Sequence, residues 1–357
     1  MTFVIAAAGT GGHVLPALAI ADALTSDGIA RSHIRFVGGD RMEAELVPAA
    51  GYSFSGFEMA RLRRSLTPRN LAIPFVVRRT SLKMTEMMEE WGTRAVLGTG
   101  GYSVIPAALA ARRLRLPFFL QEQNAVAGLA TRLAARWAQE VFLGLPGRAE
   151  RLPRSTVVGN PLRPAFEAFD RDTLVGDARR RYGVRAEGPV VGILGGSLGA
   201  RVLNESAADI VAAVGRGTVV HIMGANSDSR AAVAEAPDGV QWVRLSYETD
   251  TSYLYAACDL VVCRAGAMTV SELAATGTPS VLVPLERVGQ EANAAALSDV
   301  GAAVIVPQAA ISGIGDIVAS MLSDSDRLAF MSAAARSSAR LGSAAKIAAK
   351  LREASGG

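Results

Sequence analysis

The sequence predicts an α/β protein made of two doubly wound parallel-sheet domains, and two observations lead to this fold class. Short apolar runs alternate with helix-like stretches from one end of the chain to the other, as in parallel sheets covered by helices on both faces. These runs number about twice what one sheet needs, and 357 residues are enough for two domains. We therefore expect two such domains that face each other across a cleft.

The expected strands of the first domain are apolar runs that precede helix-like segments. The run at 3–7 leads into a stretch whose apolar residues, from Val14 to Leu24, follow the spacing of one helical face, and Gly28 supplies a left-handed stop. The strands expected in this half are 3–7, 34–37, 52–57, 95–98, 117–121, 140–144 and 156–158.

The second half repeats this alternation after a turn that is typical of a hinge, bracketed by Pro161 and Pro164. We therefore place the first domain at 1–160 and the second at 161–342. The alanine-rich tail is expected to be helical, and its last part, about 343–355, is expected to pack back on the first domain. The strands expected in this half are 189–194, 218–223, 240–244, 260–263, 279–283 and 302–306.

The composition excludes several classes of protein. Lys and Arg exceed Asp and Glu only by 37 to 33, which argues against a nucleic-acid partner. No apolar run of about 18 residues could span a bilayer, and Met1 leads directly into a core strand, so we expect no signal peptide. Cys258 and Cys263 have no nearby histidines and are expected to be buried free thiols in a reducing cytoplasm.

Four glycine-bearing loops fall at the expected carboxyl ends of strands, two in each half. They are AGTGGH at 8–13, GTGGYS at 98–103, GGSLGA at 195–200 and CRAGAMTVSE at 263–272. Ligands bind at this end of the strands in open α/β sheets, and bare N–H groups before a helix favour an anion. A tight turn that only needs the φ freedom of glycine explains one such loop better than four. The loops predict a phosphate-bearing ligand.

The spacing of these motifs argues against dehydrogenases and P-loop NTPases. From Gly9 the third glycine of a dinucleotide fingerprint would be residue 14, where Val14 stands, and no Gly-Lys-Ser/Thr is present. Asp-x-Asp, common in metal-dependent sugar transfer, occurs at 170–172 and 324–326, but in polar connections away from strand ends. Helix capping explains Asp324, in the second of these sequences, better than metal binding does. We expect neither a metal site nor a cofactor.

Eight stretches over about residues 3–310 carry a resemblance to a known family, in order and at similar spacing. They are AGTGGHVLPALAIADAL, DRMEAELVP, LGTGGYSVIPAALAA, QEQNAVAGLATR, VGNPLR, GGSLGAR, CRAGAMTVSELAATGTPSVLVP and GQEANA. Taken together, they resemble the MurG family of glycosyltransferase family 28, the N-acetylglucosaminyltransferases that convert lipid I to lipid II in peptidoglycan synthesis. The resemblance implies the GT-B fold of two Rossmann-like domains and a metal-independent, inverting transfer from UDP-GlcNAc to the C4 hydroxyl of MurNAc.

The resemblance also implies which residues bind the donor. Arg163 and Ser197 should contact the nucleotide or its phosphates, and Glu272 should accept both ribose hydroxyls. Backbone donors at the helix N-terminus of 267–269 can offset charge on the departing UDP. The full donor set is Thr10, Gly11, Gly12, Asn124, Arg163, Ser197, Leu198, Gly199, Ala267, Met268, Thr269, Glu272, Gln290 and Asn293, of which Asn124, Gln290 and Asn293 suit sugar hydroxyls.

The acceptor side is expected to lie in the first domain, where N–H groups of the glycine loops can meet the diphosphate of lipid I. The C4 hydroxyl needs a base, for which His13 is the natural candidate because imidazole titrates near neutral pH; the alternative is that it caps or braces the helix. Glu122 is the second candidate, with a structural ion pair as its alternative. The expected acceptor-binding residues are Gly9, Thr10, Gly100, Gly101, Tyr102 and Gln123.

A polyprenyl-linked acceptor requires contact with a membrane. The stretch at 61–84 mixes apolar residues with six arginines and one lysine, which suits an interface on the anionic inner leaflet. A core helix with a solvated basic face is the alternative, and the resemblance favours the membrane. The expected patch is Leu71, Ile73, Phe75, Val76, Arg78 and Arg79.

The resemblance implies a peripheral protein on the cytoplasmic side of the cell membrane, acting in cell wall biogenesis, cell shape and cell division. Its expected partners are UDP-GlcNAc, lipid I, the membrane surface, and proteins of cell-wall synthesis and division. Two rival classes remain: another GT-B enzyme, such as a glycolipid or natural-product glycosyltransferase or a UDP-GlcNAc 2-epimerase, and a non-catalytic nucleotide-sugar binding module. An epimerase would bring more acidic and histidine side chains to the cleft, whereas this chain has three histidines.

Overall fold

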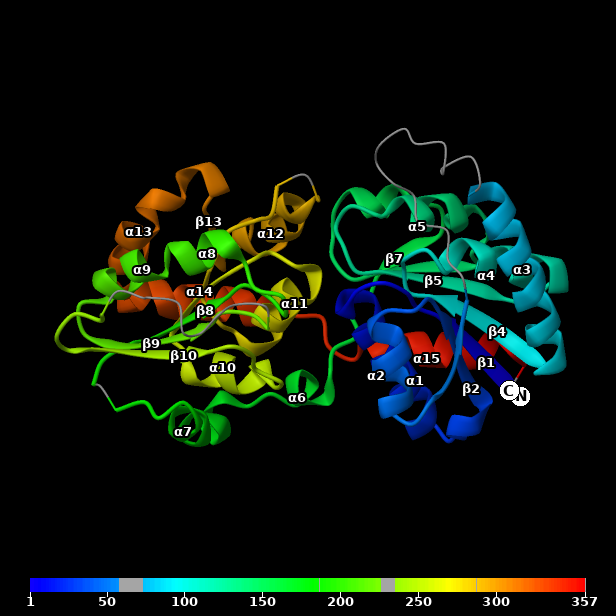
Figure 1. Cartoon of the computed structure of the whole chain (residues 1–357), viewed down its shortest axis with the longest axis horizontal. Helices are drawn as coiled ribbons and strands as arrows, with labels where there is room; N and C mark the ends of the chain where they lie inside the picture. Colours follow the sequence, from blue (N-terminus) through cyan, green and yellow to red (C-terminus); the bar gives the residue numbers. More distant parts are fainter. Residues whose placement is uncertain (58–72, 186, 226–234, 287, 357) are drawn as a thin grey trace. The chain divides into compact units, whose positions relative to one another are not determined.

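The computed structural model describes residues 1–57, 73–185, 187–225, 235–286 and 288–356, which form two compact units. Unit 1 comprises Met1–Arg163 and Arg340–Gly357, and unit 2 comprises Pro164–Ala339 (Figure 1). Each unit is a parallel-sheet α/β domain, so the predicted fold class is confirmed. The cleft between the domains stays a prediction.

Unit 1 contains, within the described residues, a seven-stranded parallel sheet in the order β3-β2-β1-β4-β5-β6-β7. The strand order reverses beside β1, which pairs with β2 on one side and β4 on the other. The loops that follow β1 and β4 therefore meet at the point where doubly wound sheets bind ligands. The strands are β1 (Thr2–Ala6), β2 (Ile34–Gly38), β3 (Ser53–Gly56), β4 (Thr93–Gly98), β5 (Phe118–Glu122), β6 (Glu140–Leu143) and β7 (Ser155–Val157).

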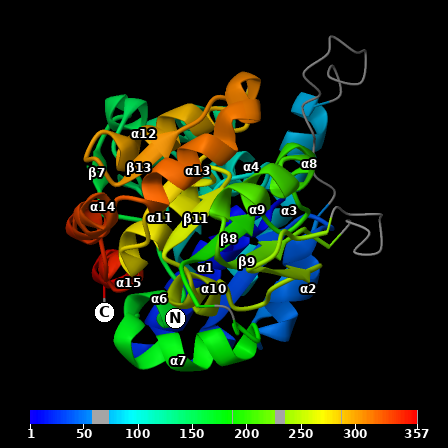
Figure 2. The same cartoon turned by 90° about the vertical axis from the view of Figure 1, so that its left-hand side faces the viewer.

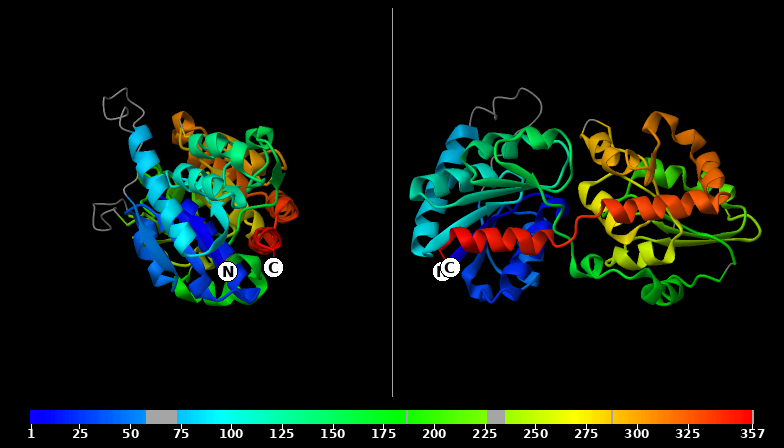
Figure 3. Two further views of the ribbon diagram at one scale, coloured as in Figure 1. Left: turned by 90° about the vertical axis from the view of Figure 1, so that its right-hand side faces the viewer. Right: turned by 180° about the vertical axis from the view of Figure 1, so that it is seen from behind.

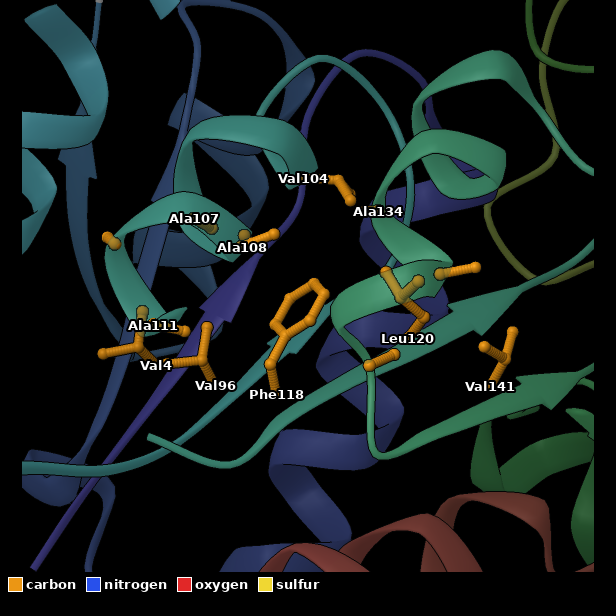
Figure 4. Packing of buried hydrophobic residues seen from close by; sticks show 14 of the residues in the cluster. Val4, Val96, Val104, Ala107, Ala108, Ala111, Phe118, Leu120, Ala134 and Val141 are labelled. Atoms are coloured by element: carbon orange, nitrogen blue, oxygen red, sulfur yellow. The ribbon is translucent and has the colours of Figure 1, made fainter. Parts of the chain in front are cut away.

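Helices cover both faces of this sheet because side chains alternate along each strand. Val4 of β1 points to the face under α3, α4 and α5, where alanines of α4 lie close against Val96 and Phe118 (Figure 4). Phe3 and Ile5 point to the opposite face, under α1, α2 and α15. The helices are α1 (Gly11–Ser26), α2 (Met42–Ala49), α3 (Ile73–Glu90), α4 (Val104–Leu114), α5 (Leu129–Ala134) and α15 (Ser343–Ala354), with 3₁₀ turns at Arg31–His33, Ala135–Trp137 and Arg148–Arg151.

Unit 2 repeats the arrangement with a described six-stranded sheet in the order β10-β9-β8-β11-β12-β13. The order reverses beside β8, which pairs with β9 and β11. The GGSLGA and CRAGAMTVSE loops follow β8 and β11, so they too meet at a switch point. The strands are β8 (Val190–Leu194), β9 (Gly217–Ile222), β10 (Val240–Leu245), β11 (Leu260–Cys263), β12 (Ser280–Leu282) and β13 (Ala303–Ile305).

The helices of unit 2 also form two layers. Apolar side chains of α8, α9 and α13 pack on one face of the sheet, and α7 and α10 pack on each other at the opposite face (Figure 2). The helices are α6 (Pro164–Glu167), α7 (Arg171–Arg181), α8 (Arg201–Glu205), α9 (Ala207–Val214), α10 (Thr251–Ala257), α11 (Ala267–Thr276), α12 (Gln290–Ser298), α13 (Ile314–Leu322) and α14 (Ser325–Ser338), with a 3₁₀ turn at Gln308–Gly313.

The C-terminal helix α15 belongs to unit 1, although α14 before it belongs to unit 2. Ile347, Ala348 and Leu351 of α15 are buried in the same core cluster as α1. The two termini lie side by side (Figure 3), and the Ser355 hydroxyl lies 3.3 Å from the sulfur of Met1. The chain therefore returns to the sheet on which it began.

Each expected strand forms within two residues of its predicted ends. The prediction of buried free thiols is confirmed for Cys258 and Cys263, and burial raises the pKa of both. Within the described ranges, no helix has the length and apolar character needed to cross a bilayer.

Candidate active site

The first glycine loop of unit 1, AGTGGH at 8–13, is fixed by a buried carboxylate that the sequence did not single out. Glu43 of α2 is 1% exposed, and its oxygens accept hydrogen bonds from the N–H groups of Gly9 at 3.0 Å and Gly39 at 2.9 Å. Gly9, expected to bind the acceptor, therefore has its N–H committed to Glu43. The donors that this loop offers an anion are those of the first turn of α1, which has no side-chain cap and begins at Gly11.

The second glycine loop packs directly against the first. Gly100 and Gly101 have φ of +102° and +78°, which favour glycine. A Cβ atom at Gly100 would overlap the ring of His13, and one at Gly101 would overlap the carbonyl of Ala8. Both glycines therefore allow close approach of the two loops, and Tyr102 beside them is exposed.

His13, in the first turn of α1, is half-buried and held through one ring nitrogen. Its Nδ1 lies 3.0 Å from the carbonyl oxygen of Thr99 and 2.9 Å from Oε1 of Gln123. The Thr99 hydroxyl in turn donates to the His13 carbonyl at 3.0 Å. Nε2 makes no hydrogen bond to any residue that the structure describes, so it is the nitrogen available to a ligand.

Glu122 and Gln123, at the end of β5, face inward. Glu122 is 2% exposed and accepts from the backbone and side-chain N–H groups of Asn124, at 3.1 and 3.0 Å, and from Gly128 at 3.0 Å. These bonds fold the loop that presents Asn124. Gln123, expected on the acceptor surface, is 2% exposed and contacts His13 instead. The residue types of Glu122 and Gln123 did not indicate that both side chains are buried.

Unit 2 has a pocket of about 520 Å³ at the switch point of its sheet. Glycines of the GGSLGA loop form one side, and Gly266 and Thr269 at the start of α11 form another. Gly199 of the expected donor set lines it, whereas Ser197 and Leu198 lie beside it at the exposed tip of the loop. The two glycine-bearing motifs of this half are therefore brought together.

Helix α11 points its N-terminus at this pocket. Gly266 precedes it with extended backbone, and no side chain caps the helix. The N–H groups of its first turn, Ala267 to Thr269, therefore favour an anion. Glu272, one turn further on, is half-buried, and its Oε2 accepts a hydrogen bond from the buried Tyr255 hydroxyl at 3.1 Å.

Arg264, which the sequence did not single out, also lines the pocket. Its guanidinium donates to the carbonyls of Val283 at 3.0 Å and Pro284 at 3.3 Å, and to Oε1 of Gln308 at 2.9 Å. Burial lowers its pKa, yet arginine stays charged at neutral pH. A cation thus stands beside the N-terminus of α11. The position of Arg264 in the CRAGAMTVSE motif is the sequence feature that could have indicated its place in the pocket.

The remaining donor candidates differ in accessibility. Gln290 lines the pocket, and its Oε1 accepts from the N–H of Leu285 at 2.8 Å. Asn293 is 1% exposed and donates to the carbonyl of Ala265 at 3.2 Å, so it supports the turn before α11. Arg163 is half-buried at the end of the first segment of unit 1.

The expected membrane patch falls on α3 and the segment before it. Leu71 lies outside the described residues. Phe75 is 77% exposed, Ile73 and Val76 are half-buried, and Arg78 and Arg79 are exposed. The side of α3 that carries Thr80, Met84 and Met88 is buried, and α3 packs on α4. The helix is thus covered along its later turns and exposed at its start.

The two Asp-x-Asp sequences act as helix caps. Asp170 accepts from the N–H of Asp172 at 3.1 Å and caps α7. Asp324 accepts from the N–H of Arg327 at 2.8 Å and caps α14, which confirms that prediction. Within the described part of the chain, no three His, Cys, Asp or Glu side chains gather as a metal site would require.

Comparison with known families accounts for both units. The model of the glycosyltransferase family 28 N-terminal domain matches residues 3–143, and that of the family's C-terminal domain matches residues 190–350. The chain belongs to glycosyltransferase family 28. It is therefore a glycosyltransferase, and each family domain contains one of the two switch points with its two glycine-bearing loops.

Individual relatives carry a more specific name. A UDP-N-acetylglucosamine–N-acetylmuramyl-(pentapeptide) pyrophosphoryl-undecaprenol N-acetylglucosamine transferase of Aeromonas hydrophila is 41% identical over 86% of this chain and 83% of its own length. A protein of the same name from Acidothermus cellulolyticus is 37% identical over 93% of this chain and 92% of its own. The crystal structure of MurG from Acinetobacter baumannii covers 99% of this chain and 100% of its own, with TM-score 0.79 and 29% identity.

Proposed function

We propose that this family 28 glycosyltransferase moves GlcNAc from UDP-GlcNAc to the C4 hydroxyl of MurNAc in lipid I, with inversion at the anomeric carbon. The observation that carries the proposal is the relative that bears this activity in its name and is 41% identical over 86% of the chain. The GT-B fold of two parallel-sheet domains agrees with it. The enzyme is thus an N-acetylglucosaminyltransferase of peptidoglycan synthesis.

Unit 2 binds UDP-GlcNAc in this proposal. The diphosphate lies at the uncapped N-terminus of α11, where the first-turn N–H groups and the guanidinium of Arg264 meet its charge. Glu272, whose carboxylate the Tyr255 hydroxyl orients, accepts hydrogen bonds from the ribose hydroxyls. As the bond between the anomeric carbon and UDP breaks, the same donors stabilise the charge that grows on UDP.

Unit 1 binds lipid I and supplies the base. Nε2 of His13 takes the proton of the C4 hydroxyl while the hydroxyl oxygen attacks the anomeric carbon from the face opposite UDP. Glu122 has a positioning role, since its oxygens already accept three hydrogen bonds from the loop of Asn124 and Gly128. The uncapped first turn of α1 faces the acceptor diphosphate.

The lipid-linked acceptor requires attachment to the cytoplasmic surface of the membrane, and we place this at the start of α3. Phe75, 77% exposed beside exposed Arg78 and Arg79, supports this. An aromatic anchor next to cations suits a surface of anionic lipid.

The test is transfer to a short-chain lipid I analogue, followed by UDP release and by mass and linkage of the product. We expect a single added GlcNAc on the C4 oxygen and no turnover without acceptor. Activity should survive EDTA, because backbone and arginine donors take the part of a metal. A C2-epimerised sugar, binding without turnover, or activity lost in chelator and restored by Mg²⁺ would each contradict the corresponding part of the proposal.

A further inference from the structure

We propose that Gln123 is a positioning residue that holds His13 with its proton on Nδ1, and so makes Nε2 the basic nitrogen. The proposal rests on the proposed function, in which His13 is the base. It follows from a chain of buried side-chain amides that runs from Asn160 to His13. Which end of each amide donates can be worked out from the two backbone carbonyls that the chain meets.

The direction of the chain is set first at Asn160, which is 1% exposed. Its Nδ2 lies 3.1 Å from the carbonyl oxygen of Gln123. A carbonyl oxygen can only accept, so the NH₂ group of Asn160 must face it. The other atom of the amide, Oδ1, then accepts from Nε2 of Gln121 at 3.0 Å.

The same reasoning continues through the two glutamines of β5. Since Nε2 of Gln121 donates to Asn160, its Oε1 faces Gln123 as an acceptor and meets the Gln123 Nε2 group. Gln123 Nε2 also lies 2.8 Å from the carbonyl of Thr99, which again can only accept. Two independent acceptors therefore orient the amide of Gln123 with Oε1 toward His13.

His13 Nδ1 then faces two acceptors, Oε1 of Gln123 at 2.9 Å and the Thr99 carbonyl at 3.0 Å. A ring nitrogen this close to two oxygen acceptors must carry the hydrogen, because an unprotonated Nδ1 would set its lone pair against lone pairs of both oxygens. In a neutral imidazole the lone pair is then on Nε2. A flipped Gln123 amide would place its oxygen against the oxygens of Thr99 and Gln121, so the chain excludes that alternative.

The surroundings leave little room for another arrangement. Gln121 and Gln123 are 0% and 2% exposed, so each reversed amide would bury unpaired groups. A side chain on Gly144 would overlap the Asn160 amide, and one on Gly100 would overlap the His13 ring. The glycines of these two loops thus make space for the chain and for the histidine that it holds.

The direct test is ¹⁵N NMR of the full chain labelled at histidine, with His13→Gln to assign the signals among three histidines. We expect the neutral His13 ring to show a protonated Nδ1 and an unprotonated Nε2. A ring protonated on Nε2 would overturn the proposal. Because this measurement needs no turnover, it decides the tautomer of His13 even if transfer to lipid I is not observed, and the same spectrum of Gln123→Met shows how far that tautomer depends on Gln123.

The kinetic test uses two variants of similar size, Gln123→Met and Gln123→Glu, with exposed Gln139→Met as control. Gln123→Met removes an acceptor that stabilises the charged ring, so we expect kcat to fall at least about tenfold and the acid limb of the pH profile to move to lower pH. Gln123→Glu supplies a carboxylate, which should move that limb about one unit higher. The KM for UDP-GlcNAc should stay unchanged in both.

Other titratable side chains on the surrounding elements are Glu43, Tyr102 and Glu122, and they are the same in all variants. Acid limbs that stay fixed in both folded variants would mean a merely structural role for Gln123 and would overturn the proposal. If Gln123→Met does not fold, the shift in Gln123→Glu and the wild-type ¹⁵N signals still decide. If the acid limbs move in opposite directions in the two Gln123 variants but His13→Gln remains active, His13 is not the base. That result would refute the proposed function of His13 and leave its tautomer as proposed.

Discussion

Two histidines stand beside the two pairs of glycine loops, and they are used in opposite ways. His13 in unit 1 is half-buried and bonded through Nδ1, with Nε2 left to a ligand. His221 in unit 2 is 2% exposed and bonded through Nε2 to Oδ1 of Asn204 at 3.0 Å, and its ring stacks on Trp242. Asn204 also donates to the carbonyl of Met223, which Gly199 approaches closely. Burial therefore leaves His221 a structural role, whereas Nε2 of the half-buried His13 suits the role of base that we propose for it.

The same difference extends to how each unit meets an anion. In unit 1, buried carboxylate and amide side chains surround the glycine loops. They fix the orientation of the His13 ring. In unit 2, backbone forms much of the pocket wall. Gly199 and Gly224 lie so close to each other that neither could carry a Cβ atom. Of the two arginines that line this pocket, Arg264 is half-buried and Arg201 is exposed.

The largest effect is expected for His13→Gln. Removing the base should lower kcat by about 10²- to 10⁴-fold, while the affinity for UDP, bound by unit 2, stays unchanged. Steady-state kinetics and calorimetry with UDP measure the two quantities, and exposed His33→Gln serves as the control. Full activity in His13→Gln would place the base elsewhere and remove the contrast with His221.

The second prediction concerns the pH dependence of unit 2. Burial, together with the charge of Arg244, lowers the pKa of His221 from 6.5 to about 4. Protonation therefore favours the unfolded chain: the stabilisation is complete above pH 6.5 and is lost as the pH falls toward 4. We expect the free energy of unfolding of unit 2 to fall by about 3 kcal/mol over this range.

Trp242 reports this unfolding selectively, because the other tryptophans, Trp91 and Trp137, belong to unit 1. Denaturant titrations followed by fluorescence in a Trp91→Phe, Trp137→Phe background would measure it. His221→Gln should flatten the pH dependence. An equally steep loss in that variant would assign the acid sensitivity to other groups.

The third effect is that of Glu272→Ala on nucleotide binding. Ribose hydroxyls left without their acceptor typically cost about 1–3 kcal/mol, so UDP should bind about 5- to 150-fold more weakly. Tyr255→Phe, which removes only the hydroxyl that donates to Glu272, should cost less. Calorimetry measures both, with exposed Glu291→Ala as control. Unchanged affinity in Glu272→Ala would move the ribose contact to another residue.

The smallest effect is expected at the start of α3. Phe75 is 77% exposed, so Phe75→Ser should leave the melting temperature unchanged. Loss of one apolar anchor should weaken binding to anionic vesicles by about 1.5 kcal/mol, roughly tenfold. Co-sedimentation tests this against Phe330→Ser, which removes a 64% exposed phenylalanine from α14 of unit 2. Equal binding by both variants would argue against the patch.

The sequence predicted the frame of the molecule well because alternation and glycine placement are local properties. Apolar runs located each strand of both sheets, and the glycine motifs marked both switch points. It did not predict which polar residues near those loops face inward. Gln123 and Asn293 have the chemistry of ligands, yet they are 2% and 1% exposed and bond to protein groups. Residue type alone does not reveal burial.

By itself, then, the sequence determined the two parallel-sheet domains, the family and the loops that carry the chemistry, since these depend on periodicity and on short motifs. Only the tertiary structure decided that Glu43 holds Gly9, that Asn160 orients two glutamines, and that the last of them sets the proton on His13. Asn160 and His13 are far apart in the chain. Hydrogen-bond direction between such residues is settled only when the folded sheet brings donors and acceptors together and excludes water that could replace them.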